Sequence, residues 1–270
     1  MPHVAVFVVA LALAFPAFAH DFYLMPSAFS ATPGQSLTVG LFNGDSFPES
    51  AVSPVLARVR DVRLLTPGAA ADATHLRAAQ KEIRADVRIP DPIPAPGGAI
   101  LVARTVPHFL SLQPNQFADY LSHEGLDSVL DWREKHHESQ APSRELYSKY
   151  AKALIATGAS NSFHTHETGA ALEIVPEASP YDLQPNEPLI LRVLHNGRPV
   201  SGEQVEVAWS GAGISRRIYI AGRTDSAGRL QILLEKPGKY RLHTVLMERC
   251  ADQKAAAWES YWASLTFETR

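Results

Sequence analysis

Short runs of β-type residues, each closed by a turn signal, occupy most of this 270-residue sequence. In the first half they cover residues 36–42, 58–66, 82–89 and 99–106. Tracts such as "TPGQ", "NGD" and "PDPIPAPGG" separate them, and the 20 prolines and 16 glycines favour a turn-rich β protein over a helical bundle. Several short strands with this spacing predict a β-sandwich.

The same pattern returns after residue 171, following a stretch rich in proline and asparagine. Seven runs read as strands: "LEIVP", "LILRVLH", "QVEVAW", "RRIYI", "RLQILL", "YRLHTVLM" and "YWASLTFE". The turns between them are explicit, for example "HNGRPVSG", "TDSAG" and "KPGK". This half of the chain therefore predicts a second, Ig-like sandwich of about 100 residues.

Between the two β-type halves the periodicity becomes helical. An apolar stripe at i, i+4 and i+8 is formed by Leu146, Tyr150 and Leu154. Glu145 and Lys149 are spaced as an exposed helical ion pair. We therefore expect two or three helices, packed on a sandwich or inserted between two.

The predicted fold is mainly β with a helical segment: two β-sandwich domains, Ig-like or prealbumin-like, with two or three helices between them. The expected boundaries are a signal peptide at 1–19, an N-terminal sandwich at 20–111, a helical insertion or linker at 112–160, and a C-terminal Ig-like sandwich at 171–270.

The beginning of the sequence resembles a cleaved export signal. Residues 4–14 form one apolar run, too short for a stable membrane anchor, and Ala17-Phe18-Ala19 has the small-x-small pattern of a cleavage site. We expect cleavage after Ala19, a periplasmic or secreted protein, and no membrane span after cleavage. A net charge of −3 gives no basic field for nucleic acid, and the one cysteine, Cys250, allows no internal disulfide.

The sequence contains no G-x-S-x-G, P-loop, dinucleotide fingerprint or H-E-x-x-H, so motifs supply no catalytic residue. The 11 histidines are more informative. Cleavage after Ala19 would make His20 the first residue, so that its α-amine and imidazole could chelate one ion. An amine with a pKa of about 8 yields its proton to a metal at modest cost. These nitrogen donors suit Ni, Co, Cu or Zn, although a first histidine can also be incidental.

His164 and His166 form the second candidate, in the polar connection "SNSFHTHETG". In extended backbone, residues two apart point to the same face, so both imidazoles could bind one ion. The alternative is a solvated loop with two incidental histidines. The metal prediction depends on whether His20 lies nearby.

Three further residues are possible additional ligands: Asp21, His108 and His243. His243 shares a strand face with Met247 by alternation, and most histidines in such positions are satisfied core or edge residues. His108 follows a proline at a predicted strand end, where either role is open.

Two other groups are predicted to be structural. His136 and His137 are neighbours on a predicted helix, about 100° apart, so they cannot share an ion and are expected to be solvated. Trp258 and Trp262 share a strand face near the C-terminus. One of them could be a sugar platform, but packing against the helical layer is the favoured interpretation.

Five segments in order, "AHDFYLMPS", "FADYLSHEGLDSVLDWREK", "SRELYSKYAKALI", "LEIVPEASPYDL" and "WESYWASLTFE", together resemble the DUF4198 family. Those exported bacterial proteins are grouped with periplasmic components of cobalt and nickel uptake systems. The resemblance covers essentially the whole mature chain. It implies an exported protein with a His-Asp start, His20 and Asp21, and a role in handling Ni, Co or another transition metal.

Three functions remain open at this stage. The first is a periplasmic metal-binding protein for uptake or delivery, with His20, His164 and His166 as ligands and a membrane transporter as partner. The second is an envelope ligand-binding or interaction module for a sugar or peptide, without metal. The third is a copper enzyme with an amino-terminal histidine, which needs a second histidine and an open coordination position; the expectation is that the protein is not an enzyme.

Overall fold

The computed structural model describes residues 20–49, 54–72, 76–79, 82–89, 97–158, 161–184, 186–211, 214–234 and 236–269. The predicted signal peptide at 1–19 lies outside these residues. The described part consists mainly of strands and contains two α-helices. The predicted fold class, mainly β with a helical segment, is therefore confirmed.

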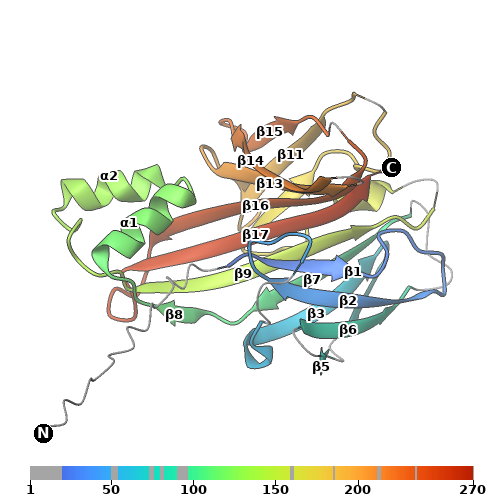
Figure 1. Cartoon of the computed structure of the whole chain (residues 1–270), viewed down its shortest axis with the longest axis horizontal. Coiled ribbons are helices and arrows are strands. Elements are labelled where there is room, and N and C mark those ends of the chain that lie inside the picture. The colour runs from blue at the N-terminus through green and yellow to red at the C-terminus, as the bar shows by residue number, and fades with distance from the viewer. Residues whose placement is uncertain are drawn as a thin grey trace, which may run out of the picture.

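The largest sheet has nine strands, in the order β14-β13-β16-β17-β9-β7-β3-β4, with β8 pairing β9 (Figure 1). From one edge to the other these are β14 (Ile214–Arg223), β13 (Gln204–Gly211), β16 (Gly238–Arg249), β17 (Trp258–Thr269), β9 (Glu145–Ile155), β8 (His108–Leu110), β7 (Ala99–Thr105), β3 (Val59–Thr66) and β4 (Ala69–Asp72).

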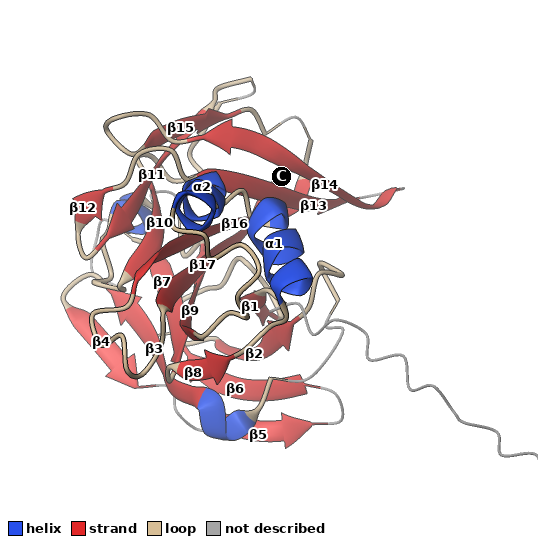
Figure 2. Ribbon diagram, turned by 90° about the vertical axis from the view of Figure 1, so that its left-hand side faces the viewer, coloured by secondary structure: helices blue, strands red, loops and turns tan. Residues whose placement is uncertain are grey.

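Two smaller sheets pack on opposite faces of the large one (Figure 2). The N-terminal sheet comprises β1 (Phe22–Pro26), β2 (Ser36–Asn43), β6 (Glu82–Arg88) and β5 (Leu76–Ala79); the C-terminal sheet comprises β10 (Leu172–Pro176), β11 (Leu189–His195), β12 (Arg198–Pro199) and β15 (Arg229–Ile232). Alternating residues of β7 face the two smaller sheets. Leu101 and Ala103 belong to the core under the N-terminal sheet, whereas Ile100 and Val102 belong to the core under the C-terminal sheet.

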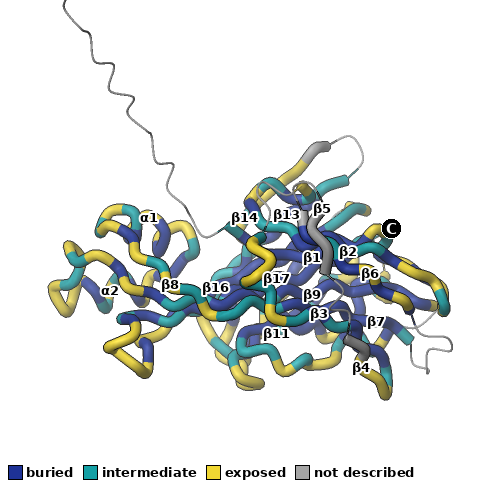
Figure 3. Tube along the Cα trace, turned by 90° about the horizontal axis from the view of Figure 1, so that it is seen from below, coloured by how far each residue is buried: buried dark blue, intermediate teal, exposed yellow. Residues whose placement is uncertain are grey.

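The helices α1 (Pro114–His123) and α2 (Asp127–Lys135) extend the layer formed by the N-terminal sheet. They bury Trp258 and Trp262 of β17 in a third apolar cluster, and Tyr120 stacks on Trp262 at 5.6 Å between ring centroids. The favoured interpretation of these two tryptophans, packing against the helical layer, is thus confirmed. In Figure 3 the helices lie at one end of the molecule with many exposed residues, and the mostly buried central strands extend away from them.

Local sequence signals explain several boundaries. Pro114 occupies the first turn of α1, and Gln116 accepts a hydrogen bond from the Gln113 backbone N–H at 3.1 Å. Asn196 and Gly197 both have positive φ in the tight turn between β11 and β12, as a two-residue hairpin of this type requires. Two short 3-10 helices, η1 (Leu56–Arg58) and η2 (Ser162–Thr165), complete the described elements.

The helix predicted around residue 150 is wrong, because Glu145–Ile155 is strand β9. It runs parallel to β17 and antiparallel to β7, and Glu145 and Lys149 are buried rather than exposed. Its alanine, lysine and leucine residues favour helix in isolation, but pairing on both sides and burial of both faces outweigh that weak preference.

The three predicted segments of the mature chain all contribute strands to the one large sheet. β3 and β7 come from residues 20–111, β9 from residues 112–160, and β13, β14, β16 and β17 from residues 171–270. The division into separate folding domains therefore stays a prediction. Among the described residues, no helix has the length and apolar character needed to cross a membrane.

Candidate functional site

His20 and Asp21, the predicted first residues after cleavage, lead directly into β1. β1 lies on the large sheet, and Ser264 of β17 donates a hydrogen bond to the Phe22 carbonyl at 2.7 Å. The first residues are therefore held where the N-terminal sheet meets α1. We define the amino-terminal cluster as His20, Asp21, Asp45, Glu124, Lys149, Glu206, Arg241 and His243.

Asp21 is the anchor of this cluster. Its carboxylate lies 2.7 Å from Arg241 Nη1 and 3.2 Å from His243 Nε2, and its backbone carbonyl accepts a hydrogen bond from Gly44. Arg241 is 1% exposed and also pairs with Glu206 at 2.6 Å. Burial opposes its charge, yet the two carboxylates raise the pKa of Arg241 overall. Asp21 is therefore committed to buried cations and is not a free metal ligand.

His243 connects Asp21 to the helices. Its Nε2 also lies 3.2 Å from Glu124, the residue that follows α1 and receives a second contact, at 3.1 Å, from His123. Burial opposes the charge on His243, but Asp21 and Glu124 raise its pKa overall. Burial opposes the charge on Glu124, but His123 and His243 lower the pKa of this carboxyl to about 2 overall. The His243 Nε2 faces both carboxylates at 3.2 Å and so acts as a hydrogen-bond donor rather than a metal ligand, which makes His243 a structural member of the cluster.

His20 lies at the accessible edge of the cluster. Its Nδ1 is 3.1 Å from Asp45 Oδ2, and the two side chains are 33% and 61% exposed. On the inner side, Lys149 donates a hydrogen bond to the His20 carbonyl and stacks over the Trp262 ring at 5.1 Å. Burial lowers the pKa of Lys149 to about 8, although nearby carboxylates including Asp21 and Asp45 oppose that shift.

The chemical capacity of this edge depends on cleavage. Two ligands each about 2.1 Å from one ion, at a right angle, lie about 3 Å apart, which matches the separation of His20 Nδ1 and Asp45 Oδ2. Within the described ranges, no group of three or more His, Cys, Asp or Glu side chains is placed to hold a metal ion. A third protein donor at this edge would be the α-amine of His20, which exists only after the preceding peptide bond is cut.

His164 lies far from His20, so the structure does not bring these two predicted ligands together. His164 contacts the Ile155 carbonyl at the far end of β9, whereas His20 contacts Lys149 of the same strand. Six residues of strand separate these contact points by about 20 Å. His164 is fully buried, with its other ring nitrogen 2.9 Å from Ser179 Oγ, and burial lowers its pKa to about 4. It is a neutral, satisfied core residue.

His166 does not share a face with His164. The segment forms η2 rather than extended backbone, and residues two apart on such a turn diverge. His166 is exposed and stacks on the Phe163 ring at 4.8 Å. His108 packs edge-on against the Tyr147 ring at 5.4 Å rather than against His20. Burial and Arg58 lower the pKa of His108.

The remaining residues considered in the sequence lie outside the amino-terminal cluster. His136 stacks on Trp132 at 3.8 Å between ring centroids. Both His136 and His137 are exposed, as predicted, and they lie just after the end of α2. Cys250 is a buried free thiol. A copper enzyme would need a second neutral imidazole beside His20, and in the described structure the contacts of His20 are with Asp45 and Lys149.

Sequence reasoning missed Asp45, Lys149 and Glu124. Asp45 belongs to "FNGDSF", which reads as a turn, and the β1–β2 pairing brings this turn next to His20. Lys149 was assigned to a helix, and Glu124 precedes a helix-terminating glycine with no sign of a long-range partner. His20 precedes β1 and Asp45 follows β2, so antiparallel pairing of the first two strands, had it been considered, would have brought these two residues together.

Comparison with known proteins decides the family. The profile described as "Domain of unknown function (DUF4198)" matches residues 17–248. The chain belongs to the DUF4198 family. The matched range contains every residue of the amino-terminal cluster. No curated protein matches the chain significantly.

Similarities to solved structures are distant. Three N-terminal domains of the bacteriophage RB49 Highly Immunogenic Outer Capsid protein align with 92% of this chain at 10% identity and a TM-score of 0.20. Trypsin-activated alpha-2-macroglobulin from Escherichia coli aligns with 93% at 7% identity and a TM-score of 0.21. The chain spans 59% and 16% of these two chains. At such TM-scores, neither similarity bears on the function of this DUF4198 protein.

Proposed function

We propose that this DUF4198 protein is exported, loses its leader after Ala19, and binds a transition-metal ion through the new amino terminus. The ligands are the α-amine and Nδ1 of His20 and the carboxylate of Asp45. The ion, Ni, Co, Cu or Zn, is cargo that the protein passes to a membrane transporter during uptake or delivery. The observation on which this rests is the 3.1 Å distance between His20 Nδ1 and Asp45 Oδ2. His20 is the first residue after the expected cut.

The donor set supports a transition metal over a hard cation. The α-amine and Nδ1 of one histidine close a six-membered chelate ring, and the carboxylate adds charge. Two nitrogen donors and one oxygen suit Ni, Co, Cu or Zn, whereas Ca and Mg prefer sites made of oxygen.

The surroundings support reversible loading. Asp21, held by Arg241 and His243, fixes the backbone from which His20 extends. The ligands themselves stay accessible, because the Asp45 side chain is 61% exposed. A rigid base with an open outer side allows an ion to enter from solvent and leave toward a partner, which delivery requires and permanent storage does not.

Calorimetric titration of the chain beginning at His20 with Ni, Co, Cu and Zn tests the proposal. The parent should bind at least one ion, and His20→Ala should abolish that binding because it removes the imidazole. Asp45→Asn should weaken it by about tenfold or more, since a charged ligand becomes a neutral one. His166→Ala, which removes another exposed histidine, is the matched control and should bind as the parent does. Binding by His20→Ala equal to that of the parent would reject the proposal.

A further inference from the structure

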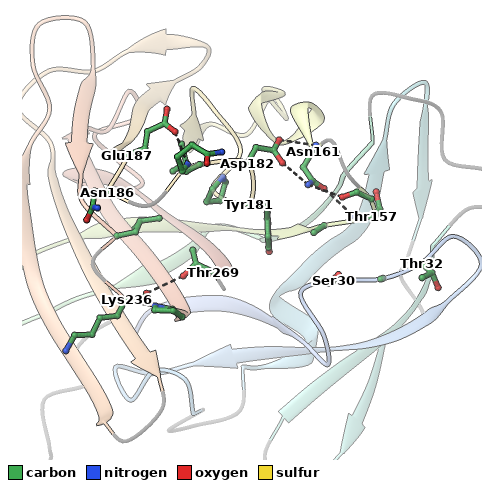
Figure 4. A pocket seen from close by; sticks show the side chains of 18 of the residues that line it. Ser30, Thr32, Thr157, Asn161, Tyr181, Asp182, Asn186, Glu187, Lys236 and Thr269 are labelled. Atoms are coloured by element: carbon green, nitrogen blue, oxygen red, sulfur yellow. Dashed lines mark hydrogen bonds between the residues drawn. The ribbon is translucent and has the colours of Figure 1, made fainter.

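A cavity of about 650 Å³ lies beyond the Ile155 end of β9, whereas the amino-terminal cluster contacts this strand at Lys149. Figure 4 shows the residues that line the cavity. Its walls come from the three sheets: the β1–β2 connection near Thr32, the end of β9 at Thr157, and the β10–β11 connection at Tyr181 to Glu187. Lys236 and Thr269 close a further side. A volume of this size, where layers meet, is typical of small-molecule sites.

The floor of the cavity is fixed by a buried amide. Asn161 is 3% exposed, and its Oδ1 accepts a hydrogen bond from the Thr157 backbone at 3.2 Å. Its backbone N–H and its Nδ2 each donate to Asp182 at 3.1 Å. Thr157 in turn accepts a hydrogen bond from Gly98 at 2.7 Å. This network joins the end of β9 to the β10–β11 connection, so two walls are held at a fixed separation.

His164 secures the same wall from behind. Its contacts with Ser179 Oγ and the Ile155 carbonyl, both 2.9 Å, join the β10–β11 connection to the end of β9. Ser179 Oγ accepts a hydrogen bond from the Tyr181 backbone at 3.3 Å, and Tyr181 Oη donates to the Leu154 carbonyl at 2.9 Å. The "SNSFHTHETG" segment therefore builds a preorganised cavity wall rather than a metal site.

The chemistry of the lining argues against a charged ligand. Both carboxylate oxygens of Asp182 are engaged by Asn161. Lys236 is the one basic residue among the described lining residues, and its ammonium lies over the Trp209 ring at 5.6 Å, which is not part of the lining. An anionic ligand would find here a single cation, which contacts the Trp209 ring, and would also meet the Glu187 carboxylate.

The backbone at the cavity also argues against a peptide added as an extra strand. The end of β9 is already paired. The Ala31 N–H donates a hydrogen bond to the Ala156 carbonyl at 2.8 Å, and the Ala156 N–H donates one to the Phe29 carbonyl at 2.9 Å. What remains is a mixed surface of amides and one carboxylate at Gln184, Asn186 and Glu187, beside the apolar faces of Pro180, Tyr181 and Pro237. Such a surface offers hydrogen bonds to hydroxyl groups and flat contacts to C–H groups.

We propose that this cavity is a binding site for a neutral oligosaccharide of two to four sugar rings. Amides and the Glu187 carboxylate bind the hydroxyl groups, and the Tyr181 and proline surfaces contact the ring faces. The site is independent of the metal proposal, because it shares no residue with the amino-terminal cluster.

An array of neutral oligosaccharides, with and without N-acetyl groups, identifies a ligand, whose affinity is then measured by calorimetry on the chain beginning at His20. Leu234→Trp and Thr32→Trp narrow the cavity from two different walls and should weaken binding by about tenfold or more. Glu187→Ala removes a hydroxyl acceptor and should weaken it by several-fold. Glu138→Ala, which removes a half-buried carboxylate near α2 and far from the cavity, is the matched control and should not change the affinity.

Thermal melting of each variant confirms folding, and two blocking variants on separate walls keep the test valid if one of them fails to fold. His20→Ala should retain full oligosaccharide affinity, which separates this proposal from the metal proposal. The inference is overturned if no neutral oligosaccharide binds, if anionic glycans or peptides alone bind, or if both blocking variants bind as the parent does.

Discussion

The surroundings of His20 and His164 differ in almost every physical respect, although both histidines stand out equally in the sequence. His164 has no exposed surface and both ring nitrogens are satisfied. His20 is one-third exposed, and its ring contact is with an exposed carboxylate. A histidine with two buried partners stabilises the fold, whereas one with an open side remains available to a ligand. Residue type and local spacing alone cannot make this distinction.

The same contrast applies to the two aspartates of the amino-terminal cluster, and it gives the largest expected effect. Asp21→Ala should destabilise the fold by about 3–5 kcal/mol, because it leaves buried Arg241 and His243 without their shared carboxylate. Asp45→Ala, at an exposed turn, should change the unfolding free energy by no more than about 0.5 kcal/mol. Urea unfolding of both variants checks the pair. Equal losses would contradict the assignment of Asp21 as anchor and Asp45 as open ligand.

The histidines themselves give the next largest effect. His164→Ala should cost about 3 kcal/mol, because it opens a cavity and leaves Ser179 and the Ile155 carbonyl without their partner. His166→Ala, in the same segment but exposed, should lie within about 0.5 kcal/mol of the parent. Guanidinium unfolding measures both. If the two variants lost similar stability, the buried role of His164 would be refuted.

The response to pH sharpens the comparison of buried histidines. The pKa of His164 falls to about 4 on folding, below its ordinary value of 6.5. The contribution of neutral His164 to the free energy of unfolding is therefore fully present above pH 6.5. About 2–3 kcal/mol of that contribution is lost as the pH falls toward 4. His243 has the opposite sign: its pKa is raised, so its contribution is present below pH 6.5 and is lost as the pH rises.

Unfolding free energies measured from pH 7.5 to 4 on the parent, His164→Gln and His243→Gln test this. The His164 variant should lose less stability than the parent on acidification, because it lacks the group that resists protonation when folded. The His243 variant should lose more. Identical pH profiles for all three proteins would show that neither histidine is perturbed as described.

Local patterns predicted the parts of the fold that depend on neighbouring residues. The Asn196-Gly197 turn and the shared face of Trp258 and Trp262 both follow from short-range rules. Strand β9 does not, because its helix-favouring residues are overruled by two partners more than forty residues away on either side. Pairing across the sheet is information that one sequence does not display.

The candidate site was predictable to a similar extent. His20 could be identified from the cleavage pattern alone, since its special chemistry comes from its position. Asp45 could not be identified in this way, because its contact with His20 depends on the β1–β2 pairing. The grouping of His164 with His166 rested on the assumption of extended backbone, whereas this segment forms η2. Burial and long-range contacts, which decide whether an imidazole is free, are the physical quantities absent from the sequence.

The most direct test of the metal site compares two chains that differ by one residue at the start, one beginning at His20 and the other at Ala19. Both keep the His20 ring and Asp45, but only the first has its α-amine on His20. Titration with Ni should show binding to the chain that starts at His20, and affinity weaker by about tenfold or more for the chain that starts at Ala19. Equal affinity of the two chains would contradict a site created by cleavage.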